Sequence, residues 1–542
     1  MNRKIILNVI CMMGLCSSAF AQKNKPKLPL NWHLLSKETD SVYGVGAERA
    51  YKELLPGKKS KKVVVAILDT GIDTLNDDLK NVLWTNKKEI PGNGIDDDKN
   101  GYVDDIHGWN FLGSKDGKQN IVDASQEADR EYLHLLKKYN NDTTKITNSA
   151  DLAYLHQLVP KLSVTRTRTH FELMKLIYES VVTIDSVVKA YYGTTNFTYE
   201  QVRDYKTDDP KLKRGQAWLA MEMYNLKGDR SSAAAIQMRR EIYESVKKRL
   251  TEVSNLEITE RSKVGDDPND NKDHYYGNNL LYFPESGHGT HVAGIVGAQR
   301  NNSNDVKGIA DNVELMTVRV VPQGDEYDKD IANGIRYAVD NGARIINMSF
   351  GKPLSPGKQW IDDAMKYAES KGVLLVHAAG NDSKNLDSIC TYPTKHLLKG
   401  GTLSNYIVVG ASTPNAIAAN FSNYGKKEVD IFAPGVNILS TMVNNRSGEM
   451  QGTSMAAPVV SGVAALVWEY YPTLTAAQLK EVLLKSATDV KEIVSPVPKK
   501  RMKSKMGLLS VTGGIVNAYN AIKLAEEMSK ASNSSKVKTT KK

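Results

Sequence analysis

The apolar positions of the chain follow two patterns that indicate an α/β core. Residues 63–68 (VVVAIL) form an unbroken β-branched and apolar run, which predicts a strand buried on both faces, as in a parallel sheet. Residues 452–468 (GTSMAAPVVSGVAALVW) are equally apolar but rich in Ala and Gly. That composition predicts a helix packed closely inside the protein.

The middle of the chain has a helical period instead. Leucines, tyrosines and charges recur at helical spacing, with few Gly or Pro, in residues 122–139, 152–162, 171–191 and 233–253. We therefore expect residues 112–280 to form a mostly helical insertion. Further on, residues 475–485 predict an amphipathic helix and residues 513–527 a closing helix. Residues 529–542 are polar, basic and poor in apolar side chains, which predicts a disordered basic tail.

The first residues have the parts of a secretory signal. Arg3 and Lys4 precede an apolar run, and residues 19–21 (AFA) form an A-x-A cleavage site. We expect residues 1–21 to be a signal peptide, because the apolar run is too short to span a bilayer. No other segment is long enough, so no transmembrane segment is expected after cleavage. The protein is predicted to be exported in a bacterium, to the periplasm, the cell surface or the medium.

Composition narrows the class further. A chain of 542 residues with 41% hydrophobic and 25% charged residues suits a soluble globular protein with a large core. The net charge of +10 comes partly from basic clusters, but no aromatic residues or known reader fold accompany them. We therefore expect no nucleic-acid partner. Cys390 is the only cysteine outside the leader, which excludes an intrachain disulfide. We expect its thiol to be buried, and a thiol that makes the cleft sensitive to oxidation or mercurials is the alternative.

Three polar side chains stand where predicted elements begin or end. Asp69 follows the strand at 63–68, the end of a strand at which open α/β sheets place their sites. His288 begins a small-residue helix, and Ser454 lies in the first turn of the helix at 452–468, near its positive dipole end. A hydroxyl needs a base, and the base needs an orienting acid. Asp, His and Ser also occur in a chain order known among triad enzymes.

Each of these residues has an ordinary explanation as well. Ser454 could cap a helix, Asp69 could end a strand in a turn, and His288 could be a surface histidine. Together these explanations require several coincidences in the right chain order. The sequence therefore favours a catalytic Asp69, His288 and Ser454.

The motifs around these residues resemble those of the subtilisin-like serine peptidases, the subtilases. LDTGID, GHGTHVAGI and GTSMAAPVVSG carry the resemblance, which covers roughly residues 63–111 and 281–525. It implies a subtilisin-like three-layer sandwich with a central, mostly parallel sheet, formed by residues 63–111 and 281–528. Residues 22–62 resemble the N-terminal segment that packs on this domain. The implied function is an exported serine endopeptidase that acts on proteins or peptides through an acyl-enzyme.

The resemblance also implies a role for each site residue. Ser454 attacks the scissile carbonyl, His288 transfers the proton, and Asp69 orients the imidazole. Asn381, at the end of a strand in residues 373–381, binds the oxyanion with the Ser454 N–H. The walls of the substrate pocket are assigned to Ser349, Phe350, Gly351, Ala378, Ala379 and Gly380. Thr391 falls near the pocket floor, where it would shorten the pocket and favour small or medium apolar side chains.

The predicted insertion separates Asp69 from His288 by 219 positions. It is either a helical ornament on the core or a gate that restricts which polypeptides reach the cleft. The gate would make the protein a processing peptidase with narrow specificity. A binding protein without catalysis is a third alternative, which the intact Asp69, His288, Asn381 and Ser454 argue against.

Two segments suggest structural calcium, while catalysis needs no cofactor. Residues 93–111 contain a D-x-D-x-N-G-x-x-D pattern, typical of a calcium-binding loop, with candidate ligands Asp96, Asp98, Asn100 and Asp104. His107 stands where an EF-hand has its last glutamate, so an ordinary acidic turn is the alternative. Asp78 with Asn301 resembles a second calcium site of the family.

Overall fold

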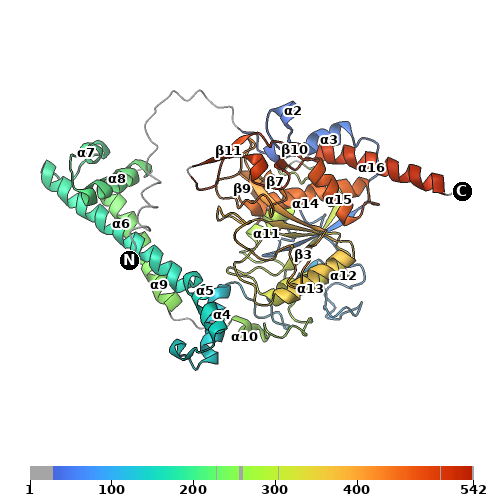
Figure 1. Cartoon of the computed structure of the whole chain (residues 1–542), viewed down its shortest axis with the longest axis horizontal. Coiled ribbons are helices and arrows are strands. Elements are labelled where there is room, and N and C mark those ends of the chain that lie inside the picture. Colours follow the sequence, from blue (N-terminus) through green and yellow to red (C-terminus); the bar gives the residue numbers. More distant parts are fainter. Residues whose placement is uncertain (1–27, 227–228, 255–259, 303, 501, 540–542) are drawn as a thin grey trace.

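The computed structural model describes residues 28–226, 229–254, 260–302, 304–500 and 502–539. The predicted signal peptide at residues 1–21 lies outside these ranges. Within them, none of the helices is both long enough and apolar enough to cross a membrane. Figure 1 shows the whole chain, with the helical insertion on one side and the sheet on the other. We call residues 63–111 and 281–528 the sheet body and residues 112–280 the insertion.

Nine strands of the described chain form one sheet in the order β10-β13-β7-β6-β5-β4-β1-β3-β2. All neighbours run parallel except β10 and β13. Their bounds are β1 (Val63–Asp69), β2 (Gly108–Asn110), β3 (Val313–Arg319), β4 (Ile345–Met348), β5 (Leu374–Ala378), β6 (Tyr406–Ser412), β7 (Ile431–Pro434), β10 (Thr488–Asp489) and β13 (Gly514–Ile515). Two hairpins lie apart, β8 (Ile438–Met442) with β9 (Arg446–Met450) and β11 (Val494–Pro496) with β12 (Lys503–Lys505).

Helices cover both faces of this sheet because successive strand side chains point to opposite sides. Val65 and Ile67 of β1 join the core that holds the side chains of α11 and α14. Ala66 and Leu68 join the core beneath α12 and α13. The sheet-body helices are α11 (Gly287–Gly297), α12 (Asp328–Asp340), α13 (Lys358–Ser370), α14 (Thr453–Tyr470), α15 (Ala476–Lys485) and α16 (Ala518–Thr539). The predicted three-layer α/β sandwich is confirmed (Figure 1).

The described part of the N-terminal segment lies against the sheet body. It contains η1 (Trp32–Leu34), α2 (Lys37–Asp40) and α3 (Ala47–Glu53). Trp32 is fully buried and donates its indole N–H to the carbonyls of Val436 and Asn437, at 3.1 and 3.2 Å. The Arg49 guanidinium of α3 lies 4.0 Å from the centroid of the Tyr519 ring on α16.

The insertion is helical, and part of it has a core of its own. Its helices are α4 (Glu127–Lys138), η2 (Thr143–Lys145), α5 (Ser149–Leu158), η3 (Val159–Lys161), α6 (Ser163–Tyr192), α7 (Tyr199–Asp204), α8 (Pro210–Asn225), α9 (Ser232–Ser254) and α10 (Glu260–Val264). Val181 and Ile184 of α6 pack with Trp218 and Leu219 of α8. Figure 1 shows α6 to α9 standing away from the sheet.

Three predictions of local structure differ from the observed elements. The first insertion helix begins at Glu127 and not at residue 122, because residues 122–124 pair with the backbone of Gln323. The closing helix begins at Ala518, since Gly514–Ile515 is a strand. That helix runs to Thr539, past its predicted end at residue 527. A Lys530–Glu526 ion pair of 3.0 Å, spaced i to i+4, supports the first turn beyond that end.

Candidate active site

Asp69 ends β1 at the edge of the sheet where the parallel strands finish. Its carboxylate is buried, and Oδ1 accepts the Thr70 N–H at 2.8 Å and His288 Nδ1 at 2.7 Å. The turn after Asp69 approaches α11 so closely that a Cβ on Gly289 would meet the Gly71 carbonyl at 2.1 Å. Gly289 therefore permits the contact that brings the imidazole onto the carboxylate.

His288 lies in the first turn of α11 and keeps 30% of its side chain exposed. Burial disfavours the imidazolium, but the charge of Asp69 and the hydrogen bond to it outweigh this effect. The pKa of His288 is consequently raised above its ordinary value. Because Nδ1 faces Asp69, Nε2 is the nitrogen left to accept a proton.

Ser454 is the second residue of α14, after a turn at Gly452 with φ of 155°. Its hydroxyl donates to the carbonyl of Ser349 at 3.1 Å, and the Ser349 hydroxyl donates to the Ser454 carbonyl at 2.9 Å. The Ser454 hydroxyl thus points at Ser349, directly after β4, and it would have to leave the Ser349 carbonyl to reach His288.

Asn381 is held beside the start of α14. Its Oδ1 accepts the Thr453 N–H at 2.9 Å and the Thr453 hydroxyl at 3.0 Å. A Cβ on Gly452 would lie 3.5 Å from Asn381 Nδ2, which places the amide nitrogen at the turn before Ser454. Because the amide oxygen is already engaged, the NH₂ group remains as the donor. Thr453 was missed in the sequence, although its place directly before Ser454 was a signal.

The predicted pocket residues fall on two neighbouring strand ends. Ser349 and Phe350 follow β4, and Ala378 ends the adjacent β5. The segment after β4 also pairs with the segment that contains Thr391, since Lys352 and Tyr392 exchange backbone hydrogen bonds of 3.0 and 2.9 Å. Ser349, Phe350, Ala378 and Ala379 are buried, Gly380 and Thr391 are half-buried, and Gly351 is exposed.

Cys390, next to the half-buried Thr391, departs from its prediction. The residue is exposed, whereas a buried thiol was expected. Partial desolvation raises the pKa of the Cys390 thiol, which makes the thiolate less available at neutral pH. The exposure arises because residues 387–390 all lie on the protein surface.

The acidic loop gathers some of its predicted ligands and adds another. Carboxylate oxygens of Glu89, Asp96 and Asp98 lie within 4.8 Å of one another. Asp104 turns away and accepts the N–H groups of Gly92 and Gly94, at 2.7 and 2.9 Å. The amide oxygen of Asn100 accepts the Tyr102 N–H at 2.8 Å. Glu89 lies outside the motif and carried no signal in the sequence.

The second predicted calcium pair, Asp78 and Asn301, is not assembled. Asp78 Oδ1 accepts the side-chain amides of Asn302 and Asn304, while Asn301 is exposed. The two amide donors occupy Asp78 Oδ1, while a calcium site there stays a prediction.

Comparison with known proteins agrees with this architecture. Residues 60–501 match the model of the subtilase family. The chain is 40% identical over 208 residues to a thermostable alkaline protease of Halalkalibacterium halodurans, covering 38% of this chain and 54% of that protein. It is 39% identical over 207 residues to subtilisin DY of Bacillus licheniformis, covering 38% of this chain and 72% of that protein.

Among solved structures, the prenylagaramide maturation protease PagA is 31% identical and covers 44% of this chain and 82% of its own, with a TM-score of 0.37. The matched stretch spans about half of the alkaline protease. The family match over residues 60–501 covers most of this chain. The chain therefore belongs to the subtilase family, and the predicted family is confirmed.

Proposed function

We propose that the protein is an exported serine endopeptidase that cleaves proteins or peptides through an acyl-enzyme. The observation that carries the proposal is the 2.7 Å hydrogen bond between His288 Nδ1 and the buried Asp69 carboxylate. This bond selects the imidazole tautomer whose Nε2 is basic, and it stabilises the imidazolium formed during the reaction.

The proposed reaction begins when substrate draws the Ser454 hydroxyl away from the Ser349 carbonyl. His288 Nε2 then accepts the hydroxyl proton as Oγ bonds to the scissile carbonyl carbon, and the carbonyl π electrons move to oxygen. Asn381 Nδ2 and the Ser454 N–H donate to that oxyanion. Collapse breaks the C–N bond, and His288 protonates the leaving amine. Water then attacks the acyl-enzyme in the same way and releases the Ser454 hydroxyl.

For the residue before the cleaved bond, we propose a pocket between two walls. Ser349, Phe350 and Gly351 would form one wall, and Ala378, Ala379 and Gly380 the other. The bridge between Lys352 and Tyr392 supports this assignment, because it brings Thr391 beside the Gly351 wall. A threonine at the floor shortens the pocket and favours small or medium apolar side chains.

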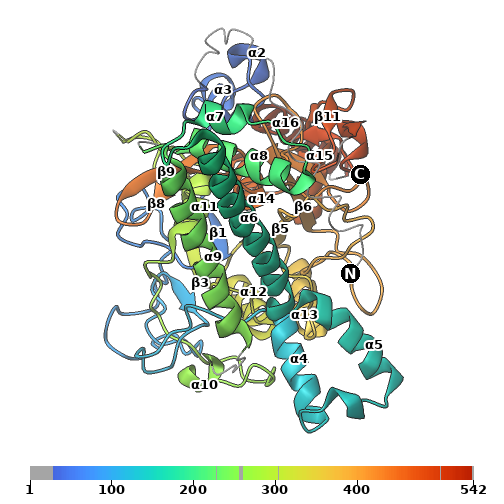
Figure 2. The same ribbon diagram turned by 90° about the vertical axis from the view of Figure 1, so that its left-hand side faces the viewer.

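A specific observation favours the narrow-specificity alternative. The insertion leaves the sheet at the end of β2 and returns just before α11. Figure 2, viewed from the insertion's side, shows α6 and α9 crossing in front of α11 and β1. An insertion in this place would limit access by folded proteins more than access by short peptides.

Two further parts of the proposal concern calcium and export. Glu89, Asp96 and Asp98 offer three carboxylates, the hard oxygen donors that Ca²⁺ prefers, and a bound ion would tie the loop together as a structural element. Export is supported by the signal-like residues 1–21. No nucleic-acid partner is proposed.

Fluorophosphonate labelling tests the proposed activity directly. The probe should label the full-length protein, and labelling and peptide hydrolysis should disappear in Ser454→Ala. Ser447→Ala removes an exposed serine of β9 and should leave both unchanged. Persistent labelling of Ser454→Ala would reject Ser454 as the nucleophile, and no labelling of the native protein would favour the binding-protein alternative.

A further inference from the structure

A buried lysine joins the insertion to the proposed pocket wall. Lys352 directly follows Gly351 and is only 1% exposed. Its ammonium contacts Asp328 Oδ1 at 2.8 Å and donates to the Glu326 carbonyl at 2.7 Å. The third partner is the carboxylate of Glu127, the first residue of α4 in the insertion. A charge from the insertion thus neutralises a charge that belongs to the wall segment.

The same end of α4 also contacts a second segment of the sheet body, residues 325–326. The Glu127 N–H donates to Asp325 Oδ2 at 2.8 Å. Arg130, which pairs with Glu127 at 2.8 Å, donates to the carbonyls of Asp325 and Glu326, both at 3.1 Å. Glu127, Arg130 and Lys352 are each paired with an opposite charge, which is the condition under which buried ion pairs persist.

An apolar contact holds the wall segment two residues further on. Leu354 is buried in a cluster whose other buried members all come from the insertion, namely Ala128, Leu135, Ile146, Leu158 and Leu162. Residues 352 and 354 of the sheet body are therefore both anchored in the insertion. The anchored residues lie close to Ser454 along the chain. Ser349, whose carbonyl accepts the Ser454 hydroxyl, is only three residues before Lys352.

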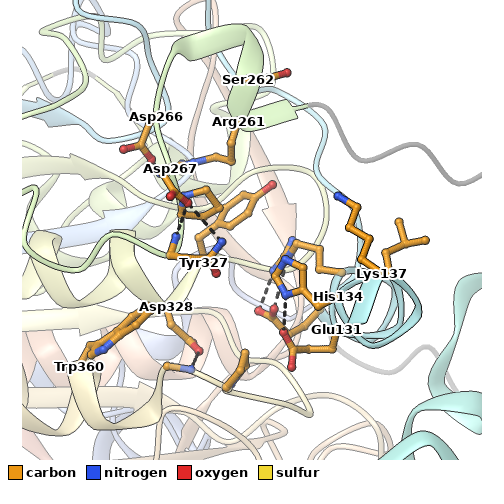
Figure 3. Close-up of a pocket in the computed structure, with 17 residues that line it drawn as sticks. Glu131, His134, Lys137, Arg261, Ser262, Asp266, Asp267, Tyr327, Asp328 and Trp360 are labelled. Carbon is orange, nitrogen blue, oxygen red and sulfur yellow. Dashed lines mark hydrogen bonds and ion pairs between the residues drawn. The ribbon is translucent and has the colours of Figure 1, made fainter. Parts of the chain in front are cut away.

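Packing between α4 and the sheet body is incomplete beside these contacts. A cavity of about 660 Å³ lies beside the ion pairs and is lined by Glu127 and Asp328. Figure 3 shows it between Glu131, His134 and Lys137 of α4 on one side and Asp328 and Trp360 of the sheet body on the other. The cavity leaves part of this interface unfilled. The described contacts between α4 and the proposed wall are therefore the ion pair of Lys352 and the packing of Leu354.

We propose that Glu127 and Lys352 are positioning residues through which the insertion fixes the wall of the substrate pocket. Lys352 also shares two backbone hydrogen bonds with Tyr392, so its position is transmitted to both the wall and the floor segments. The inference rests on the proposed peptidase function. It extends that function, because the insertion then determines how tightly a short peptide binds, in addition to which proteins can enter.

Glu127→Gln tests the proposal, with Glu131→Gln as the matched control. Both changes remove one negative charge from α4, but Glu131 contacts His134 and Tyr154 and has no contact with Lys352. A fluorogenic tetrapeptide series that varies only the residue before the cleaved bond (Ala, Leu or Phe) measures kcat and KM. We expect KM to rise about 5- to 10-fold in Glu127→Gln while kcat changes by less than about 2-fold. Equal KM values in the two variants would overturn the proposal.

A second measurement separates this inference from the peptidase function itself. In a Ser454→Ala background, the same tetrapeptides bind without being cleaved, and their Kd should weaken with Glu127→Gln but not with Glu131→Gln. Leu354→Ala leaves all charges in place and should weaken binding in the same direction. If fluorophosphonate labelling succeeds but these Kd values match, only the positioning role fails. If labelling fails in the native protein, the peptidase function fails, and the Kd comparison still decides the role of Glu127.

Discussion

The sheet body and the insertion are stabilised in different ways. In the sheet body, strands such as β1 are buried on both faces, and the polar site residues lie at strand ends and helix starts. In the insertion, a small separate core holds α6, α8 and α9 together, while α4 and α10 meet the sheet body through buried ion pairs and small apolar contacts. Arg261 of α10, for example, pairs with Asp330 of α12 at 2.8 Å.

This difference suggests that the sheet body and the insertion have different roles. A continuous apolar core holds backbone atoms in fixed places, which is what the proposed chemistry at Asp69, His288 and Ser454 requires. Buried ion pairs contribute little net stability, because desolvation offsets their attraction, but they specify one arrangement. The contact between α4 and the proposed pocket wall is therefore suited to adjusting substrate selectivity, while the residues proposed for catalysis belong to the sheet body.

The largest expected effect comes from breaking the acid–base pair of the sheet body. In Asp69→Asn the imidazole loses its charged partner, and kcat should fall by about 10⁴-fold. Asp77→Asn changes an exposed carboxylate near the same turn and should retain activity. Steady-state kinetics on a tetrapeptide measure both, and equal activity of the two variants would contradict the proposed role of Asp69.

The same pair predicts a pH dependence. His288 can accept a proton only when neutral, so kcat/KM should fall as the pH drops through its pKa, which Asp69 raises above the ordinary 6.5. Removing the negative charge lowers that pKa, so any residual activity of Asp69→Asn should persist to lower pH than that of the native protein. If the acidic side of the pH profile lies at the same pH in Asp69→Asn and in the native protein, the assignment of His288 as the base is contradicted.

A smaller loss is expected from the proposed oxyanion donor. Asn381→Ala should lower kcat by about 10²–10³-fold with little change in KM, because the donor acts mainly in the transition state. Asn415→Ala, an exposed asparagine elsewhere in the sheet body, should have no effect. A rise in KM without a fall in kcat would show that Asn381 binds substrate and does not stabilise the oxyanion.

Shortening the insertion tests the other half of the comparison. Phe171 of α6 and Tyr243 of α9 stack with ring centroids 5.6 Å apart, so a short linker can replace residues 172–242 and leave α4, α5 and α10 in place. If the removed helices form a gate, cleavage of a folded protein substrate should increase several-fold, while kcat/KM for a tetrapeptide changes by less than about 2-fold. Unchanged protein cleavage would reject the gate.

The smallest effect concerns calcium. Ca²⁺ should raise the Tm of the inactive Ser454→Ala protein by about 2–8 °C relative to chelator, because it binds the folded loop preferentially. Glu89→Gln should abolish the difference, whereas Asp116→Asn, an exposed carboxylate outside the loop, should preserve it. A Tm that is independent of Ca²⁺ would remove calcium from the proposal.

The sequence was most informative where function depends on local features. Asp69 ends a strand, and His288 and Ser454 lie where helices begin, so short patterns were sufficient to propose them as site residues. Glu127 and Lys352 could not be found in this way, since they are 225 positions apart and meet only in the folded chain.

The acidic loop of residues 93–111 shows a different limit of sequence patterns. The motif included Asp104, but its φ of 52° turns the carboxylate onto the Gly92 and Gly94 N–H groups. A spacing rule assumes a backbone path, and a left-handed residue changes that path. The helix α8 was missed for another reason, because its apolar residues are interrupted by charges and by Gly215.

The position at which the insertion joins the sheet body affects how such a chain can evolve. Asn110 and Asn278 form a two-way backbone bridge, with N–H to carbonyl distances of 2.9 and 3.0 Å, so the outgoing and returning strands meet side by side. Whatever lies between them closes a loop whose entropic cost grows only slowly with its length. Evolution can thus lengthen, trim or exchange the outer helices α6 to α9 with little disturbance to the scaffold, whereas α4 and α10 must keep the ion-pair partners of Lys352 and Asp330.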